Sequence, residues 1–304
     1  MSYHAATIVQ PGSNNTKIKH GFVESVRSCG ISLAASDDSG INVCPKAFPK
    51  SRILKMRAEG ATWEDVIKTA HSLNLSTCSI ACVTSEAGHG RFDNVRNPRA
   101  NLTRWYVENR EEFKQQCLAE LWREYNRLKA NQILACRPNI DSDVPWERTF
   151  PEMFDVPCSF WDYTKVSKRL GKTPDNYHLT FSVSDATTAD DWQRVYDTNS
   201  PIAVVFDSTW QPQGKAEYRK FGALPTWYTD PNGYRWQVID GDRSDFRFLD
   251  PKRPICVGLR LKGMKFGKYI ARLSGFAKLL PRRLRNVLTD IHPAGNYINK
   301  SLAV

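Results

Sequence analysis

The chain has 304 residues and a formal net charge of +11. No apolar run approaches the roughly 18 residues of a membrane span, and residues 1–21 contain no apolar signal-peptide core, so we expect a soluble cytoplasmic protein and no membrane partner. The positive charge favours a polyanionic partner such as nucleic acid, although a basic surface without such a partner gives the same composition.

Seven short apolar runs, each followed by a cluster of polar residues, predict parallel strands. Helix-like or polar stretches separate most of them, and this alternation is typical of an α/β fold. We expect a (β/α) barrel-like domain of the TIM type, regular or incomplete, over residues 31–263, with appendages at 1–30 and 264–304. The predicted strands are residues 31–35, 132–136, 158–161, 177–181, 202–206, 236–239 and 255–259.

Two helical segments are predicted between the first two strands. The first lies in an insertion at residues 45–77, where Thr62 is a plausible N-cap and Asp65 stands at the capping-box position. Residues 101–130 carry apolar side chains at helical spacing, so we expect one long helix whose aromatic residues belong to the core.

Carboxylates at the strand ends are the candidate catalytic groups, because a parallel barrel gathers its active site at the carboxyl ends of its strands. Asp38 follows the first predicted strand, and Asp240 and Asp242 follow a late one. Crowded carboxylates raise one another's pKa and can divide into a nucleophile and an acid/base. Each alone also suits a helix cap or a turn. The candidate substrate-binding residues at other strand ends are Asn139, Asp143, Asp162, Lys165 and Ser182.

Three of the eight cysteines lie in loop-like sequence after the first strand: Cys44, Cys78 and Cys82. Three thiolates there can hold a [4Fe–4S] cluster with an open iron, or a zinc ion with His89 or His71 as fourth ligand. Ordinary loop thiols are the alternative. Four others lie in strand-like or helical runs and are expected to be small buried hydrophobes, namely Cys117, Cys136, Cys158 and Cys256.

Residues 262–285 carry eight cations and no acid. Phe266, Tyr269 and Phe276 stand among these cations, which is a pattern that suits phosphate pairing combined with base stacking. A basic helix at a membrane surface, or a segment docked through its leucines with solvated arginines, fits the same composition. The candidate nucleic-acid contacts are Lys262, Lys265, Lys268, Arg272, Arg282, Arg283 and Arg285.

Ordered motifs over residues 31–263 resemble the phage-encoded gene product 88-like family. This resemblance implies a phage or prophage origin and action inside a bacterium, but no activity. In that family the Cys-Pro dipeptide leads quickly into Cys-x-x-x-Cys, and the insertion at 45–77 departs from this pattern. The motifs are residues 40–45, 142–147, 160–165, 179–182, 222–225, 238–242 and 258–263.

Residues 35–40 are also similar to the Asp-Ser-Gly turn of tRNA-guanine transglycosylases, and residues 240–242 fall where those enzymes keep a nucleophilic aspartate. The resemblance implies base exchange in DNA, guanine for a 7-deazaguanine. Asp242 or Asp240 would attack the sugar carbon, and Asp38 would manage the proton. The compact zinc signature of the tRNA enzymes is absent.

Two further hypotheses remain open. In the first, Cys44, Cys78 and Cys82 form the cluster site of a barrel resembling the radical S-adenosylmethionine enzymes, which also place three cysteines after the first strand. In the second, the chain is a non-catalytic nucleic-acid-binding protein whose acids only cap helices.

Overall fold

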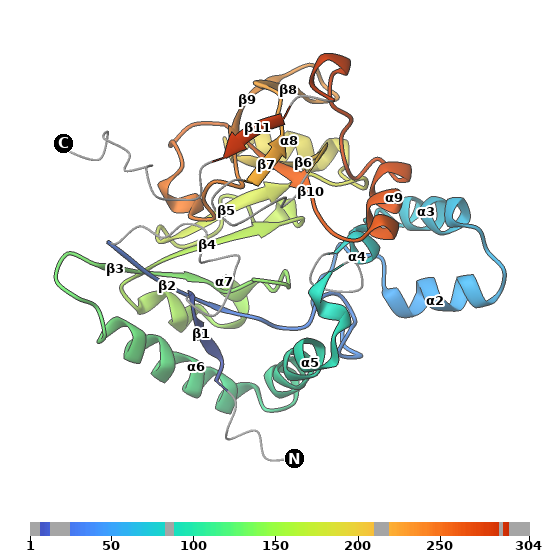
Figure 1. Ribbon diagram of the computed structural model, residues 1–304. Helices are drawn as coiled ribbons and strands as arrows, with labels where there is room; N and C mark the ends of the chain where they lie inside the picture. The colour runs from blue at the N-terminus through green and yellow to red at the C-terminus, as the bar shows by residue number, and fades with distance from the viewer. Residues whose placement is uncertain (1–6, 13–24, 83–87, 210–218, 286–287, 292–304) are drawn as a thin grey trace.

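The computed structural model describes residues 7–12, 25–82, 88–209, 219–285 and 288–291 (Figure 1). A large sheet carries nine strands, in the spatial order β1 (Val9–Pro11), β2 (Val26–Ile31), β3 (Ile133–Arg137), β4 (Cys158–Thr164), β5 (Tyr177–Ser182), β6 (Ile202–Thr209), β10 (Cys256–Leu261), β9 (Arg235–Asp240) and β8 (Trp227–Thr229). A second sheet pairs β7 (Arg219–Gly222) with β11 (Leu288–Ile291).

The seven central strands of the large sheet, β2 to β9, are parallel, and only the edge strands β1 and β8 are antiparallel to their neighbours. Strands β2 to β6 lie in chain order, and β10 then inserts between β6 and β9. The predicted α/β class is confirmed. Among the described strands no pairing joins the two edges, so the sheet is open and a closed TIM barrel is not formed.

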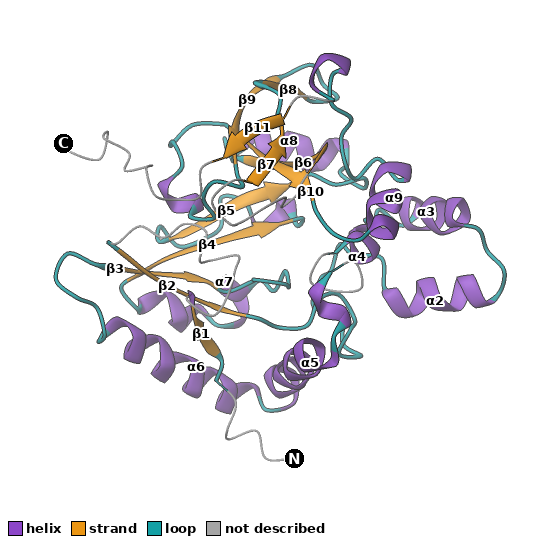
Figure 2. Ribbon diagram, in the orientation of Figure 1, coloured by secondary structure: helices purple, strands orange, loops and turns teal. Residues whose placement is uncertain are grey.

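The helices are α2 (Lys50–Ala58), α3 (Trp63–Ser72), α4 (Cys78–Ala81), α5 (Asp93–Glu108), α6 (Arg110–Tyr125), α7 (Trp146–Thr149), α8 (Ala189–Asp197) and α9 (Lys265–Leu273). Figure 2 shows α5 and α6 together on one side of the sheet. Their buried side chains, Trp105 and Phe113 among them, join Leu134 of β3 in the main core. The aromatics of this segment are therefore core residues, as predicted.

The predicted single helix over 101–130 is wrong, because the chain breaks at Asn109, whose φ is −131° and ψ 58°. The break lets Phe113 turn back onto Trp105, with ring centroids 5.6 Å apart. A helical pattern in the sequence does not reveal such a break, since apolar spacing continues on both sides of it.

The predicted boundary after residue 30 needs correction, because β1 and β2 both belong to the sheet. The first parallel strand is Val26–Ile31, and the apolar run 31–35 mostly follows it. That run is buried because it leaves the sheet through the core, where the Ala34 amide donates a hydrogen bond to Thr103 Oγ1 at 2.8 Å. The segment after residue 263 is likewise packed on the domain, since Ile270 of α9 lies in one cluster with Ile80 of α4.

The insertion at 45–77 is a helical hairpin whose two ends meet. Ser76 donates a backbone hydrogen bond to the Lys46 carbonyl at 2.7 Å, and its own carbonyl accepts one from Phe48 at 2.8 Å. The predicted capping box at the start of α3 is confirmed: Thr62 Oγ1 accepts from the Asp65 amide at 3.1 Å, and the Asp65 carboxylate accepts from the Thr62 amide at 2.8 Å. The hairpin therefore leaves and re-enters the domain at one point.

Within the part of the chain that the structure describes, none of the helices has the length and apolar character needed to cross a bilayer.

Gly30 lies where β2 and β3 approach each other closely, and a larger residue there would test this packing. A Cβ atom at this position would lie 2.6 Å from Ile140 Cδ1 and 2.8 Å from the Arg137 carbonyl oxygen. Because backbone cannot yield as a flexible side chain does, we expect Gly30→Ala to lower the free energy of unfolding by about 1–3 kcal/mol. Urea denaturation checks this, and an unchanged unfolding midpoint would contradict the packing described.

Candidate functional site

A cavity of about 320 Å³ lies at the carboxyl ends of the parallel strands, where the sequence predicts an active site. Its size and its mixture of apolar and polar walls are typical of a small-molecule site. The described residues that contribute polar groups to its wall are Ser36, Cys44, Lys46, Cys78, Ser79, Cys82, Arg137, Asn139, Asp141, Ser142, Asp143, Tyr163, Lys165, Ser182, Asp245, Arg260 and Lys262.

The cavity draws together strands that are far apart in the sheet. Ser36 follows β2 and Leu261 ends β10, and both lie on its wall. Five strand spacings separate β2 from β10 in the sheet order, or roughly 24 Å in a flat sheet at about 4.8 Å per spacing. Residues from distant parts of the sheet therefore contribute to one cavity.

Three cysteines face this cavity together. Cys44 comes from the loop after β2, Cys78 begins α4 and Cys82 directly follows it. Cys78 and Cys82 are four residues apart, so the helical turn puts both on one face. The predicted metal-binding cysteines are thus brought to one wall of the cavity, although the insertion separates them in the sequence.

The Cys44 sulfur has fixed surroundings. It accepts a hydrogen bond from the Ser36 amide at 3.3 Å and lies 3.7 Å from the Asp141 carbonyl oxygen. Burial raises the pKa of the Cys44 thiol, and the neighbouring Cys78 raises it further. Burial also raises the pKa of Cys78, while the nearby Lys165 acts in the opposite direction. In the absence of a bound metal ion, the Cys44 and Cys78 thiols therefore stay protonated at neutral pH.

Asp185, in the loop after β5, fixes the turn that leads into Cys78. Its buried carboxylate accepts hydrogen bonds from Ser76 Oγ at 2.6 Å and from the Thr77 amide and hydroxyl at 3.0 and 2.6 Å. It also pairs with His71 Nε2 at 3.1 Å. The second cysteine loop is therefore tied to the sheet and not only to its own hairpin, and His71 is committed to this contact.

Lys165, directly after β4, extends to the cavity near the cysteines. Its amide donates to Asp143 Oδ2 at 2.9 Å, and its ammonium lies 5.8 Å from the centre of the Phe276 ring. No carboxylate among the described residues forms an ion pair with that ammonium. Burial alone would lower the pKa of Lys165, but Cys78, Asp143, Cys44 and Cys82 raise it, so the ammonium stays charged.

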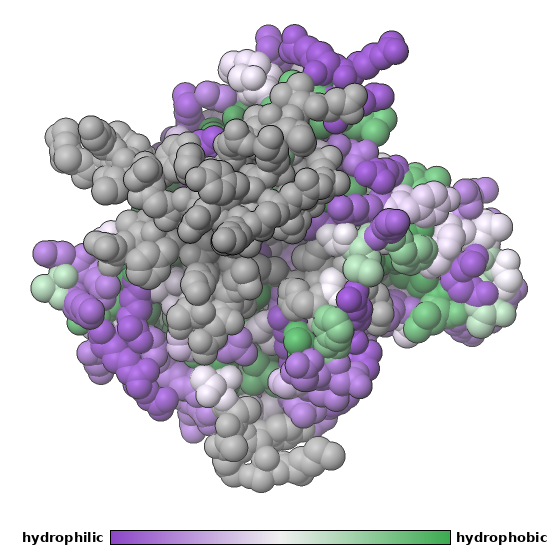
Figure 3. Space-filling view, in the orientation of Figure 1, coloured by the Kyte–Doolittle hydropathy of each residue, from purple (hydrophilic) through white to green (hydrophobic). Residues whose placement is uncertain are grey.

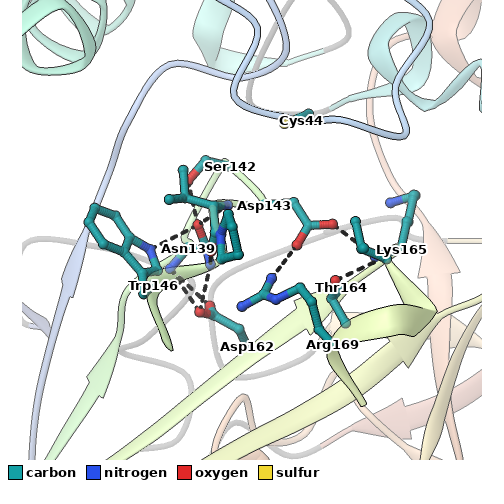
Figure 4. A network of polar contacts seen from close by, with 12 residues as sticks. Cys44, Asn139, Ser142, Asp143, Trp146, Asp162, Thr164, Lys165 and Arg169 are labelled. Carbon is teal, nitrogen blue, oxygen red and sulfur yellow. Dashed lines mark hydrogen bonds and ion pairs between the residues drawn. The ribbon is translucent and has the colours of Figure 1, made fainter. Parts of the chain in front are cut away.

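Beneath the cavity, a network of buried polar groups braces the strand ends (Figure 4). Arg169 binds Asp143 Oδ1 at 2.5 Å and Glu147 Oε2 at 2.9 Å. The Asn139 amide oxygen accepts from Ser142, Val144 and Trp146, while its own Nδ2 donates to Asp162. Asn139 therefore has its hydrogen-bonding capacity filled by the protein, which suits an organising residue.

Asp162 lies deeper than the cavity wall. Its carboxylate is fully buried and accepts hydrogen bonds from Asn139 and from the Tyr177 hydroxyl at 2.7 Å. Burial raises the pKa of Asp162 to about 7, against the opposing effect of Arg137. Of the predicted substrate-binding residues, Asn139, Asp143, Lys165 and Ser182 lie on the wall and Asp162 supports it.

Each of the three predicted catalytic aspartates forms an ion pair with a lysine or an arginine. Asp242 is buried, with Arg260 Nη1 at 3.0 Å and Lys262 Nζ at 2.8 Å from its oxygens. Asp240 also binds Arg260, at 2.8 Å, and Asp38 binds Lys50 at 3.1 Å. None of the three is among the described residues of the cavity wall.

Several wall residues escaped the sequence analysis. Tyr163 has a buried hydroxyl for which no hydrogen-bond partner exists among the described residues, and Arg137 lies 4.9 Å from its ring centre. Lys46 reaches the wall from the insertion, and Phe276 reaches it from beyond α9. Alternation along β4 places Tyr163 and Lys165 on the same face, which is the one signal that the sequence offered for Tyr163.

The predicted nucleic-acid contacts spread from the cavity outward. Lys262 lies on its wall, while Lys265, Lys268 and Arg272 belong to α9. Arg272 pairs with Asp207 at 2.8 Å. A short 3₁₀ turn at Arg282–Leu284 and the next residue carry the exposed Arg282, Arg283 and Arg285.

His89, the predicted fourth metal ligand, starts a 3₁₀ turn at His89–Arg91, but its side chain lies outside the described part of the structure. Among the residues described, no group of three or more His, Cys, Asp or Glu side chains is arranged to hold a metal ion.

Residues 7–278 match the protein family described as Gene product 88. The chain belongs to this family. The match spans β1 to the residues just beyond α9, so it confirms the resemblance to phage gene product 88 and includes the cysteine loops and the whole described cavity. No curated protein and no solved structure gives a significant match to this Gene product 88 chain.

The raised pKa of Asp162 has a measurable consequence for stability. Its folded-state pKa of about 7 exceeds the unfolded value of about 3.9, so the folded protein binds the proton more tightly. The stability contribution of this group is full below about pH 4 and is lost as pH rises through 7. We expect Asp162→Asn to make the slope of unfolding free energy against pH more positive between these values, by up to about 1.4 kcal/mol per pH unit.

Urea denaturation of both proteins at several pH values gives this slope. Parallel stability curves for Asp162→Asn and the wild type would contradict a raised pKa at this carboxyl.

Proposed function

We propose that Cys44, Cys78 and Cys82 hold a [4Fe–4S] cluster with one open iron, and that the protein is an enzyme of the radical S-adenosylmethionine type. The observation that carries this proposal is the common position of the three thiols on a cavity at the carboxyl ends of an open parallel sheet. The first parallel strand precedes all three, which is the placement that the resemblance to such enzymes implies.

A cluster with one open iron needs three thiolates, and three cysteines stand on the described cavity wall. A structural zinc ion needs a fourth ligand, and the His71 imidazole is bound to Asp185 instead. In a cluster each cysteine binds a different iron, so the sulfurs stand around a cavity. The Ser36 amide that donates to Cys44 is the type of hydrogen bond that tunes cluster potentials.

A cluster held by Cys44, Cys78 and Cys82 would supply one-electron reduction of a sulfonium cofactor such as S-adenosylmethionine, with the electron drawn from an external low-potential donor. The protein's own residues enclose the proposed cluster site. Lys165 places a positive charge beside the anionic cluster site, and the Asp143–Arg169 pair holds the Lys165 backbone in position.

The sheet supports the same assignment at the level of the fold. We infer that it curls into an incomplete barrel, open between β2 and the β9–β8 edge, with the cavity at the top. Such a barrel leaves room at its mouth for a cofactor and a substrate side by side.

Base exchange with Asp242 as nucleophile has less support from the geometry. A buried carboxylate held behind the described cavity wall by Arg260 and Lys262 is a poor nucleophile, because both cations stabilise its negative charge. The surroundings of Asp242 suit a structural ion pair between β9 and β10.

Phage origin of the family and a cluster that needs thiolates in reduced form both fit action in the cytoplasm of a host bacterium.

Cysteine substitutions test the proposal. After anaerobic reconstitution with iron and sulfide, the wild type should bind about four irons per chain and absorb near 400 nm, and Cys44→Ala, Cys78→Ala and Cys82→Ala should each lose most of this. Cys117→Ala is the matched control, because Cys117 is buried in α6 and should leave the iron content unchanged. A wild type without bound iron, or equal loss in the control, would contradict the cluster.

Asp185 tests how the second cysteine loop is held. Asp185→Ala removes the acceptor for Ser76 and Thr77, so we expect a reconstituted iron content well below that of the wild type, with the fold retained by circular dichroism. His71→Ala removes only the half-exposed contact to the same carboxylate and should have a smaller effect. Full iron loading in Asp185→Ala would show that the hydrogen bonds from Ser76 and Thr77 to Asp185 are not needed to hold the cysteine loop.

A further inference from the structure

Helix α9 exposes aromatic side chains among cations. Phe266 is 48% exposed and Tyr269 50%, and both stand beside Lys265, Lys268 and Arg272. Figure 3 shows apolar and hydrophilic residues mixed over the region of α9 and α3. Aromatic rings that project to solvent beside cations can stack on a base while the cations pair with phosphates.

The exposed rings continue a row of aromatic contacts that begins on the inserted hairpin. The Arg57 guanidinium lies 4.7 Å from the ring centre of Trp63, and Trp63 meets Phe266 with centroids 5.0 Å apart at 61°. Tyr269 follows Phe266 by three residues, so it stands on the same face of α9. We call Trp63, Phe266 and Tyr269 the aromatic platform.

The platform lies next to the cavity. Lys262 precedes α9 and Phe276 follows it, and both line the cavity, so α9 is fixed to the wall at its two ends. On its inner side α9 packs on α4, where Ile270 meets Ile80 and Ala271 meets Ala81. Helices α9 and α4 therefore lie between the rings of the platform and Cys78, and the platform stands on the outer side of the helix that borders the proposed reaction site.

We propose that the platform binds single-stranded nucleic acid and delivers one nucleotide to the cavity. This inference rests on the proposed function, since it names the substrate class of that site. Aromatic rings stack on bases of any sequence, and bases are free to stack only where the strand is unpaired. Within segment 262–285, Lys262 and Arg272 pair with acids of the protein, and the exposed cations Lys265, Arg282, Arg283 and Arg285 complement the phosphates. A substrate base must in any case leave its stack to reach an enclosed site.

Fluorescence anisotropy with full-length protein tests the inference. The probes are labelled 20-nucleotide DNA and RNA strands and the matching duplex, and anionic phosphatidylserine vesicles are tested separately by co-sedimentation. We expect single strands to bind at least tenfold more tightly than the duplex, and Phe266→Ala with Tyr269→Ala to weaken binding at least tenfold. Tyr269→Phe keeps the ring and should keep the affinity.

One control variant and one measurement of salt dependence make the readout specific. Trp227→Ala removes a ring on β8 that is 47% exposed and carries Arg235 at 5.0 Å, so it matches the platform chemistry away from the cavity and should not change binding. Lys265→Ala with Lys268→Ala should reduce the slope of log affinity against log salt by about 1.4, or about 0.7 per single-strand phosphate contact.

Equal binding of duplex and single strand, vesicle binding without strand binding, or equal loss in Trp227→Ala would overturn the inference. Binding is measured on iron-free and reconstituted protein. Strand binding without any iron uptake would refute the cluster and leave the platform standing, whereas a loaded cluster without strand binding would refute the platform alone. Stronger binding of the RNA or of the DNA strand identifies the preferred substrate.

Discussion

Backbone hydrogen bonds between residues 46–48 and Ser76 hold together two loops that a helical hairpin separates in the sequence. One loop carries Cys44 and the other leads into Cys78. Asp185 ties the second loop to the end of β5, so the two loops have fixed positions relative to the sheet. The hairpin itself adds its own small core, with Ile53, Val66 and Ala70 packed on Ile80 and Ile270. Without this junction the three thiols would have no common position, and both the cluster site and the adjacent platform would be lost.

Buried charge gives the strand ends a rigid arrangement below the cysteines. Arg169 lies between Asp143 and Glu147, and Arg260 lies between Asp240 and Asp242, each with nearly its whole side chain out of solvent. A buried ion pair contributes little net stability, but the loss of one partner is costly, because it leaves the other charge unpaired. Such pairs therefore fix geometry more than they add free energy. In contrast, the Lys165 ammonium has no ion-pair partner among the described residues, and the buried Tyr163 hydroxyl has no hydrogen-bond partner among them.

Six of the seven predicted strands overlap an observed strand by four or more residues, because buried parallel strands are continuous apolar segments. The first strand was misplaced, since β2 carries the polar residues Arg27 and Ser28 near its start and the apolar run at 31–35 is mostly buried loop. The sequence singled out Cys44, Cys78 and Cys82 as loop cysteines after the first strand, but not their common position on the cavity, which depends on long-range contacts of Ser76 and Asp185. The ion pairs of the acidic cluster at 240–242 could not be read from the sequence, because the cations that bind it, Arg260 and Lys262, come from the neighbouring strand and the residue after it. The sequence likewise held no sign that Phe276 meets Lys165.

The central claim is that the three cysteines hold a cluster with an iron open to a cofactor, and electron paramagnetic resonance tests it directly. The reconstituted protein is reduced with dithionite and its spectrum is recorded with and without S-adenosylmethionine. A reduced [4Fe–4S] cluster should give a paramagnetic signal, and coordination at the open iron should change that signal when the cofactor is added. Absence of the signal in protein that carries iron and sulfide, or a spectrum that the cofactor leaves unaltered, would contradict the account.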